Sequence, residues 1–526
     1  MKKFHRGIII MAHAKTFSAT TIGVDAHLVS VEVDLAMGIP KFNIIGLPDT
    51  AIKESTKRLL ASLKNSGFSL PTKVVTVNLA PADIKKEGTF FDLPIAVGIL
   101  SAGKFLSIPQ DFLEETLFLG ELSLDGSITF IKGALAIACD AARQLKKKRL
   151  IVPKANAAEA ALIEELEVIG VDHITELIAY LRKERHIAPT INPFTTAMAK
   201  NIAHAHDFSQ VKGQHQAKRA LQIAAAGRHN ILFIGPPGSG KTMLAKRLQT
   251  IMPDMVFDEV LETSKIYSIS GKLGKKSLVL QRPFRAPHHT ISQAGLVGGG
   301  SYPQPGEISL AHHGILFLDE LTEFKRDTLE VLRQPLENKT VCISRVHQSI
   351  NFPASFLLVA ALNPCPCGFL GDKKRVCHCS PQQISKYLGK LSGPLLDRID
   401  LQINVQSVEY DTIKDKAGNH TSSEQLYETV QKALTMQETR FGTKNMLNSL
   451  MPSDMIDSYC VLTPGAEELI KKAFDRLRLS MRGYHKILKV ARTIADLESS
   501  ELIDVHHLQE AIMYRSLDQH LEAQRS

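Results

Sequence analysis

The sequence predicts an α/β protein built from several domains. Its 526 residues correspond to about three to four domains of ordinary size. Strand-like and helix-like segments alternate over residues 20–170, and a strand, a glycine-rich loop and a helix follow over 229–249. Residues 464–521 are strongly helical. With 44% hydrophobic and 22% charged residues, the chain has the balance of a folded globular protein, which excludes a mainly disordered chain or a collagen-like fibre.

The first α/β domain is predicted from its local patterns. Val29–Leu35 and Val74–Leu79 are rich in β-branched residues and bounded by turn residues, which indicates strands. Thr50–Ser66 carries apolar residues at helical spacing and stops before Gly67, a typical helix end. We expect further helices at 93–102 and 134–145 and a strand at 149–152.

Changes in composition set the expected boundaries. We predict an amino-terminal extension over 1–14, an α/β domain over 15–180, a proline-containing linker over 181–206, a second α/β domain over 207–408 and a helical lid over 409–526.

The first residues resemble a secretion signal, since Lys2, Lys3 and Arg6 precede a short apolar run. That run is at the lower limit of length, and Met11 offers an internal start, so we interpret residues 1–10 as an upstream start or a short extension. No run of 18 or more apolar residues occurs, so we expect no contact with a membrane and a cytoplasmic location.

Four of the seven cysteines lie within fifteen residues: Cys365, Cys367, Cys377 and Cys379. This clustering suggests a four-thiolate zinc site, with His378 as a spare ligand. The Cys-x-Cys spacing is less usual for zinc than Cys-x₂-Cys. Reduced thiols in a loop, or a redox pair, therefore remain open as alternatives.

A phosphate-binding loop follows the predicted strand at 229–234. Its residues are Gly235, Pro236, Pro237, Gly238, Ser239, Gly240, Lys241 and Thr242, and a helix begins directly after them. Glycines allow backbone N–H groups to surround phosphates, Lys241 adds a positive charge, and the Thr242 hydroxyl is suited to Mg²⁺.

A buried strand ends in Asp319 and Glu320, 78 residues beyond Lys241. Asp319 is placed to hold Mg²⁺ with Thr242, and Glu320 to polarise the attacking water. An Asn-Lys-x-Asp motif for guanine is missing, because Thr340 and Val341 follow Asn338-Lys339. We therefore expect ATP rather than GTP.

Two further polar positions are ambiguous on their own. Asn363 ends the predicted strand 356–362, where it could reach the γ-phosphate or cap a turn before Pro364. Arg398 lies between Asp397 and Asp400, a pattern that alone would be typical of a solvated helix face.

The order of these motifs resembles that of AAA+ ATPases. Three strings narrow the likeness to the magnesium-chelatase-like branch: Pro283-Phe-Arg-Ala-Pro-His-His-Thr290, Gly306-Glu-Ile-Ser-Leu-Ala311 and Ala361-Leu-Asn-Pro-Cys-Pro-Cys-Gly368. With Gly46-Leu-Pro-Asp49 and Asn78-Leu-Ala-Pro-Ala-Asp83, they resemble the YifB/ComM family over nearly the whole chain from about Ala14.

This resemblance implies roles for three residues. Asn363 would be sensor 1, Arg398 would be an arginine finger that reaches the γ-phosphate of a neighbouring subunit, and Arg482 would be the lid's sensor 2. An arginine donated between subunits requires a ring, so a homo-hexamer is implied.

The net charge of +9, from 63 basic and 54 acidic residues, is concentrated in two stretches. Residues 263–306 and 338–371 contain no Asp or Glu and hold +8. Their cations include the candidate DNA contacts Lys272, Lys275, Lys276, Arg282, Arg285, Lys339 and Arg345. In the chelatase-like branch both stretches would face a central pore, where such charges attract a phosphate backbone. The glycines of 263–306 predict a mobile loop; the alternative is an ordinary solvated face.

The amino-terminal domain resembles the proteolytic domain of Lon proteases, through Phe118-Leu-Gly-Glu-Leu-Ser-Leu-Asp-Gly126 and Arg149–Lys154. Lon needs a serine and a lysine. Phe91 or Asp92 stands where the serine is expected, the lysine position falls near Leu135, and Lys132 lies three residues early. We therefore expect a Lon-protease-like α+β fold without peptidase activity, serving DNA binding or ring formation.

The predicted function is that of an ATP- and Mg²⁺-dependent hexameric DNA translocase or helicase. The family resemblance implies branch migration during recombination of incoming DNA in natural transformation, with single-stranded and branched DNA and recombination proteins such as a recombinase as partners. The alternatives are a chelatase-type motor that remodels a protein partner, a protease, and a DNA-binding scaffold that uses ATP only to assemble.

Overall fold

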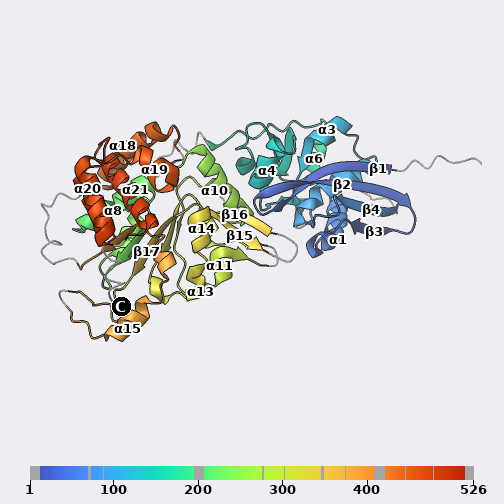
Figure 1. Ribbon diagram of the computed structural model, residues 1–526. Coiled ribbons are helices and arrows are strands. Elements are labelled where there is room, and N and C mark those ends of the chain that lie inside the picture. The colour runs from blue at the N-terminus through green and yellow to red at the C-terminus, as the bar shows by residue number, and fades with distance from the viewer. Residues whose placement is uncertain are drawn as a thin grey trace, which may run out of the picture. The chain divides into compact units, whose positions relative to one another are not determined.

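A computed structural model describes residues 12–68, 73–86, 88–194, 206–274, 278–300, 303–344, 349–372, 375–407, 421–444, 446–477 and 479–515. The chain forms two compact units, one of residues 1–201 with 257–280 and one of residues 202–256 with 281–526 (Figure 1). Residues 1–11 of the predicted extension over 1–14 and most of the second half of the predicted linker lie outside the described residues, as do Lys275, Lys276 and Arg345.

The first unit contains a four-stranded sheet in the order β1 (Ala12–Ile22), β2 (Asp25–Met37), β4 (Lys73–Ala80), β3 (Lys41–Ile45). Neighbouring strands are antiparallel except for β3 and β4. A parallel sheet of β5 (Thr116–Phe118), β8 (Arg149–Pro153) and β9 (Glu167–Val171) and a hairpin of β6 (Glu121–Leu122) and β7 (Ile128–Thr129) complete its strands. This mixture of antiparallel and parallel pairing is the predicted α+β fold. The first strand starts at Ala12, inside the expected extension.

Between residues 50 and 181, the described helices of this unit are α1 (Thr50–Asn65), α2 (Asp92–Ala102), α3 (Gln110–Glu115), α4 (Ala134–Arg143), α5 (Lys154–Ala160) and α6 (Ile174–Leu181), with a short 3₁₀ turn at Thr89–Phe91. Asp49 caps α1 by accepting a hydrogen bond from the Ile52 N–H at 2.8 Å. The central helix α2 is buried along almost its whole length and packs on β1 and β2. A Cβ at Gly98 would lie 2.6 Å from Val33 Cγ2, so glycine permits this close approach.

Helix α10 (Phe257–Ile269) belongs to this first unit, although it lies within the predicted ATPase domain. Its Lys265 Nζ lies 3.4 Å from Asp140 Oδ1 of α4, and the Ser268 carbonyl accepts from the Gly133 N–H at 3.1 Å. Leu273 and Leu278 beyond it are also buried. The prediction of a mobile loop from residue 263 is therefore wrong for this part of the chain, because apolar side chains anchor it.

The second unit is built on a five-stranded parallel sheet in the order β11 (Phe284–Arg285), β14 (Ile315–Leu318), β17 (Leu357–Leu362), β10 (Ile231–Ile234), β18 (Leu401–Asn404). The three central strands are buried at every position, as expected for a parallel sheet covered on both faces. Because the strands run parallel, the chain leaves each of them at the same edge of the sheet.

Helices and short elements connect these strands. They are a 3₁₀ turn at Phe208–Gln210, α8 (His215–Gly227), α9 (Lys241–Leu248), α11 (Gln293–Val297), β12 (Gly298–Gly299) paired with β13 (Gln304–Pro305), α12 (Glu307–Leu310), a 3₁₀ turn at Leu321–Glu323, α13 (Arg326–Glu330), α14 (Arg333–Asn338), the hairpin β15 (Thr340–Ser344) and β16 (Ser349–Pro353), α15 (Pro381–Leu388) and α16 (Gly393–Leu396).

The predicted helical lid consists of α18 (Ser423–Phe441), short 3₁₀ turns at Asn448–Leu450 and Ser453–Met455, α19 (Ile456–Tyr459), α20 (Pro464–Arg476), α21 (Met481–Leu497) and α22 (Val505–Met513). It shares one hydrophobic core with the sheet domain, since α18 and α21 both pack on α8 (Figure 1). The lid is thus part of the second unit rather than a separate compact body.

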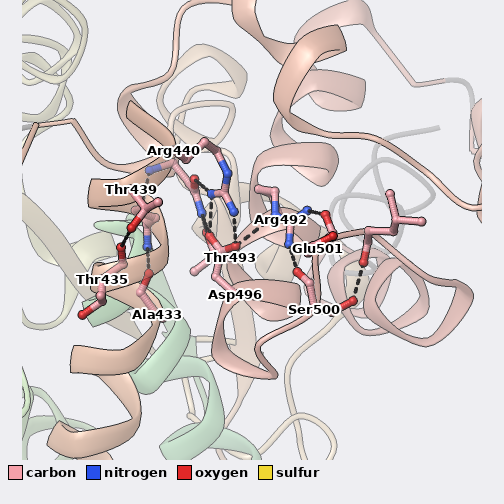
Figure 2. A network of polar contacts seen from close by, with 12 residues as sticks. Ala433, Thr435, Thr439, Arg440, Arg492, Thr493, Asp496, Ser500 and Glu501 are labelled. Atoms are coloured by element: carbon pink, nitrogen blue, oxygen red, sulfur yellow. Dashed lines mark hydrogen bonds and ion pairs between the residues drawn. The ribbon is translucent and has the colours of Figure 1, made fainter. Parts of the chain in front are cut away.

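A buried carboxylate organises the lid. Asp496 is fully buried and accepts hydrogen bonds from both terminal nitrogens of Arg440, at 2.8 and 2.5 Å, and from Arg492 Nε at 3.1 Å (Figure 2). Asn448 Nδ2 donates to the same carboxylate at 2.7 Å. These bonds tie α18 to α21 and satisfy a charge that would otherwise be costly to bury.

Within the described residues, the predicted strands and helices of both units are present, with ends shifted by up to four residues. Among the described residues, none of the helices is both long and apolar enough to cross a membrane.

Candidate nucleotide-binding site

The phosphate-binding loop connects β10 to α9. Gly235 has no room for a side chain, because a Cβ there would lie 2.1 Å from the Val405 carbonyl oxygen. Gly240 directly precedes α9 and has a φ of +93°, which favours glycine. These constraints explain the glycines, and such a loop before a helix can present backbone N–H groups to phosphates.

Lys241 is folded into this loop. Its Nζ donates hydrogen bonds to the carbonyls of Gly235 and Pro236, at 2.7 and 2.9 Å, and to Asn363 Oδ1 at 3.2 Å. Burial lowers the pKa of the ammonium group, and the nearby charges of Asp319 and Glu320 oppose that shift. The tip of β17 and the phosphate loop are therefore in direct contact.

Thr242 and Asp319 lie together although 77 positions separate them. The Thr242 hydroxyl donates to Asp319 Oδ2 at 2.6 Å, and the Glu320 N–H donates to Asp319 Oδ1 at 3.0 Å. A hydroxyl beside a carboxylate at the end of a phosphate loop is the donor set that Mg²⁺ uses with bound phosphates. These two residues fit that ion by the chemistry of their oxygens.

Glu320 follows β14 in a left-handed conformation, with a φ of +52°, and its side chain is 56% exposed. Its Oε2 lies 3.4 Å from His289 Nδ1, and the His289 ring packs edge-on against Phe324. The sequence predicted no role for His289, since nothing in the segment Pro287-His288-His289 is specific to pairing with a carboxylate.

Arg398 and Arg482 meet at Glu337 of α14. Arg398 Nη2 lies 2.6 Å from Glu337 Oε1, and Arg482 pairs with the same oxygen. The Arg398 side chain is only 10% exposed, whereas that of Arg482 is 47% exposed. Glu337 was missed from the sequence because nothing in α14 links it to arginines 61 and 145 positions away.

The carboxylate that follows Arg398 is not part of a solvated face. Asp400 is 9% exposed, and its carboxylate lies 2.8 Å from Lys486 Nζ and 3.5 Å from His229 Nδ1. Burial alone would raise the pKa of Asp400, but the charges of Lys486 and His229 bring it well below its usual range. One of the two aspartates that flank Arg398 in the sequence, Asp400, therefore belongs to a buried ion pair.

In the described part of the chain, the candidate DNA contacts Arg282, Arg285 and Lys339 hold contacts within the protein. Arg282 is 8% exposed and donates to the carbonyls of Pro253 and His313, at 2.5 and 2.7 Å, so a contact with DNA would require it to give up these bonds. Arg285 forms a two-pronged pair with Glu307, at 2.5 and 2.7 Å.

Lys339 is also engaged within the protein. Its Nζ donates to the Leu336 carbonyl at 2.9 Å, and burial, aided by the charge of Arg228, lowers its pKa to about 8. It therefore closes the end of α14 rather than presenting a free charge. Lys272 is exposed.

The four clustered cysteines are brought together. Their sulfurs all lie within 4.8 Å of one another, and Cys365 is fully buried while the other three are partly exposed.

The Lon-like region lacks a reactive serine and lysine at the expected place. Asp92 is buried, and its Oδ2 accepts from Arg58 Nε at 2.8 Å and from the Leu122 N–H at 3.1 Å. Burial raises the pKa of Asp92 to about 6 against the opposing charge of Arg58. The ion pair of Asp92 with Arg58 therefore stands where the serine is expected. Leu135, near the expected lysine position, is buried, and Lys132 is exposed.

The parallel sheet, the phosphate loop and the polar ends of β14 and β17 define a nucleoside-triphosphate-binding domain of the AAA+ class, followed by a helical lid. Family models support this class over most of the chain. The model described as "Magnesium chelatase, subunit ChlI" matches residues 207–413, "Subunit ChlI of Mg-chelatase" matches 31–156, and "Magnesium chelatase, subunit ChlI C-terminal" matches 420–515.

Individual relatives are similar to this chain in sequence. "Competence protein ComM" of Haemophilus influenzae is 43% identical over 96% of this chain and 98% of its own length. "Uncharacterized protein YifB" of Escherichia coli is 41% identical over 94% of this chain and 96% of its own. "Lon protease 2" of Bacillus subtilis is 27% identical over 27% of each chain. The chain belongs to the YifB/ComM family of magnesium-chelatase-like AAA+ proteins.

Proposed function

We propose that the protein is an ATP-driven hexameric DNA translocase or helicase that drives branch migration during recombination of incoming DNA in natural transformation. The proposal of ATP hydrolysis rests on two hydrogen-bonded pairs, Lys241 with Asn363 and Thr242 with Asp319. Glu320 follows Asp319 directly. The relative named as a competence protein supports the role in transformation.

In this proposal, each side chain of the nucleotide site has a task. Lys241 exchanges its contacts with loop carbonyls for the phosphates of ATP, and Thr242 and Asp319 hold Mg²⁺, which neutralises phosphate charge when bound. Glu320 accepts a proton from the attacking water and orients it, and Asn363 positions that water or the γ-phosphate.

Arg398 and Arg482 complete the site in a ring. Arg398 leaves Glu337 and reaches the γ-phosphate bound to a neighbouring subunit, where a guanidinium stabilises the charge that develops during hydrolysis. Arg482 of the lid acts as the second arginine sensor. A homo-hexamer supplies six such interfaces.

The proposed DNA contacts are Lys272, Lys275, Lys276, Arg282, Arg285, Lys339 and Arg345. They would follow the phosphate backbone of single-stranded or branched DNA without reading bases. Of these, Arg282, Arg285 and Lys339 would have to exchange their contacts within the protein for phosphates. The proposed setting is the cytoplasm, with a recombinase and other recombination proteins as partners. The competing proposal is a chelatase-type motor that remodels a protein partner. It is motivated by the matching family model, which is described as a subunit of magnesium chelatase.

The hydrolytic assignment is tested by Glu320→Gln, with Glu323→Gln as the matched control, because Glu323 is an exposed carboxylate three positions away. We expect ATP turnover to fall by about 10²- to 10⁴-fold in Glu320→Gln while ATP binding is retained. Turnover at the parent rate in this variant would disprove the water-activating role.

A further inference from the structure

The geometry of the cysteine cluster points to a bound metal. The sulfur of Cys365 lies 3.3 Å from that of Cys367 and 3.6 Å from that of Cys377, and the sulfurs of Cys367 and Cys377 are 3.6 Å apart. A disulfide would bring two sulfurs to about 2.05 Å. Four thiolates around one zinc ion, each about 2.3 Å from it, lie about 3.8 Å from one another. The observed separations fit the second arrangement.

The surroundings of the cluster also suit a small metal site. The Cys379 N–H donates to Cys377 Sγ at 3.5 Å, and the Gly368 N–H donates to the Cys365 carbonyl at 3.0 Å, which closes a tight turn within the first Cys-x-Cys pair. The spread of at most 4.8 Å leaves space for a single ion among the sulfurs. Four thiolates suit zinc or an iron–sulfur centre, and a single ion held by four cysteines is typical of structural zinc.

The cluster adjoins the nucleotide site at two points. Cys365 follows Asn363 by two residues, and Asn363 bonds Lys241. Gly368 lies against the phosphate loop, because a Cβ there would approach Pro237 Cδ to 2.7 Å. The first two ligands are therefore fixed to the strand tip and the loop that would handle the γ-phosphate.

The far end of the cluster leads to the segment after Glu320. Cys379 precedes the Ser380 cap of α15, where Ser380 and Gln383 exchange two hydrogen bonds. Beyond α15, Lys390 Nζ donates to the Thr322 carbonyl at 2.9 Å. A metal that joins both cysteine pairs would thus close a loop between Asn363 and the chain that supports Glu320.

We propose that Cys365, Cys367, Cys377 and Cys379 bind one structural zinc ion, and that this ion braces Asn363 and the phosphate loop for ATP hydrolysis. The bracing rests on the proposed ATPase function; the metal site does not. The ion takes no part in the chemistry of hydrolysis.

Metal content of the full-length protein tests the site. We expect one zinc per chain by mass spectrometry after purification under reducing conditions, and tetrahedral cobalt–thiolate absorption bands after replacement by cobalt. Cys377→Ser should weaken zinc binding by more than about tenfold. His378→Ala, an exposed neighbour, should retain the metal. Protein without zinc and unable to take up cobalt, or with iron in its place, would overturn the proposal of a zinc site.

The brace is tested by ATP turnover. Cys377→Ser should lower turnover at least about tenfold, with ATP affinity changed less, while His378→Ala turns over at the parent rate. If Cys377→Ser does not fold, zinc is removed from the parent by a chelator, and turnover should fall and return on adding zinc. Full turnover without zinc would overturn the brace and leave the site standing. A zinc-loaded parent without any ATP turnover would instead contradict the proposed ATPase function.

Discussion

The hydroxyl of Thr242 lies 2.6 Å from a carboxylate oxygen of Asp319, so the first turn of α9 and the end of β14 meet at one point. If this pair holds Mg²⁺, Thr242→Val should raise the magnesium concentration for half-maximal ATP turnover by about tenfold or more, since the variant has one ligand fewer. Thr242→Ser keeps the hydroxyl and should behave like the parent. A magnesium titration of ATP turnover measures this. If Thr242→Val reaches half-maximal turnover at the same magnesium concentration as the parent, Thr242 is not a ligand of the metal.

The pairing of Arg398 with Glu337 predicts opposite effects of two substitutions. Arg398→Ala should lower ATP turnover by about 10³- to 10⁵-fold, as for other arginine fingers. Glu337→Ala should raise basal turnover by about two- to fivefold, because breaking a partly exposed ion pair costs up to about 1 kcal/mol and Arg398 must break it to reach a neighbour.

Steady-state kinetics distinguish these effects, with Arg333→Ala, which removes another arginine of α14, as the control. If Glu337→Ala were as inactive as Arg398→Ala, Glu337 would be holding the arginine in its working position rather than away from it.

The buried pair of Asp400 and Lys486 predicts a pH dependence of stability. The pKa of Asp400 is lowered in the folded protein. This pair therefore stabilises the fold above the unfolded pKa of about 4, and that contribution is lost as the pH falls below it.

Removing the lysine should weaken this effect. In Lys486→Met, the buried Asp400 keeps His229 and the Asn230 N–H as partners, so its pKa should rise above that in the parent. The variant should therefore lose stability relative to the parent as the pH rises through the interval between the two folded pKa values. We expect a loss of about 3–5 kcal/mol at neutral pH. Chemical unfolding at several pH values measures it, with Lys471→Met on the exposed face of α20 as control. A difference that does not change with pH would contradict the account of this pair.

The exposed Lys272 is the described cation best placed to test DNA binding. Lys272→Glu should weaken single-stranded DNA binding at low salt and reduce the salt dependence by about 0.7 in the log–log slope for each phosphate that the protein no longer neutralises. Lys471→Glu makes the same charge change on the lid and should have little effect. Equal affinities for the two variants would remove Lys272 from the DNA-binding residues.

The nucleotide site was predictable from the sequence because each of its parts ends a strongly patterned strand or begins a helix. A phosphate loop needs glycine at fixed positions, and buried strands such as 315–318 are continuous apolar runs. Parallel strands deliver their carboxyl ends to one edge, which is why the motifs alone could place Asn363 and Asp319 near Lys241.

The partners of charged side chains could not be predicted in this way. The stretch around Arg285 contains no acidic residue up to Gly306, yet Glu307, the next residue, neutralises it. Arg282 serves backbone carbonyls that no sequence pattern marks. The position of α10 beside α4 likewise depends on packing between segments more than 100 residues apart.

The most direct test of a DNA motor is ATP hydrolysis by the purified protein with and without single-stranded DNA, beside strand displacement from a three-way junction. We predict that DNA stimulates hydrolysis and that displacement requires ATP. Both activities should be lost in Lys241→Ala and retained in Lys246→Ala, whose exposed lysine lies on the same helix. Hydrolysis that is indifferent to DNA, without any displacement, would contradict the proposal and favour a motor that remodels a protein partner.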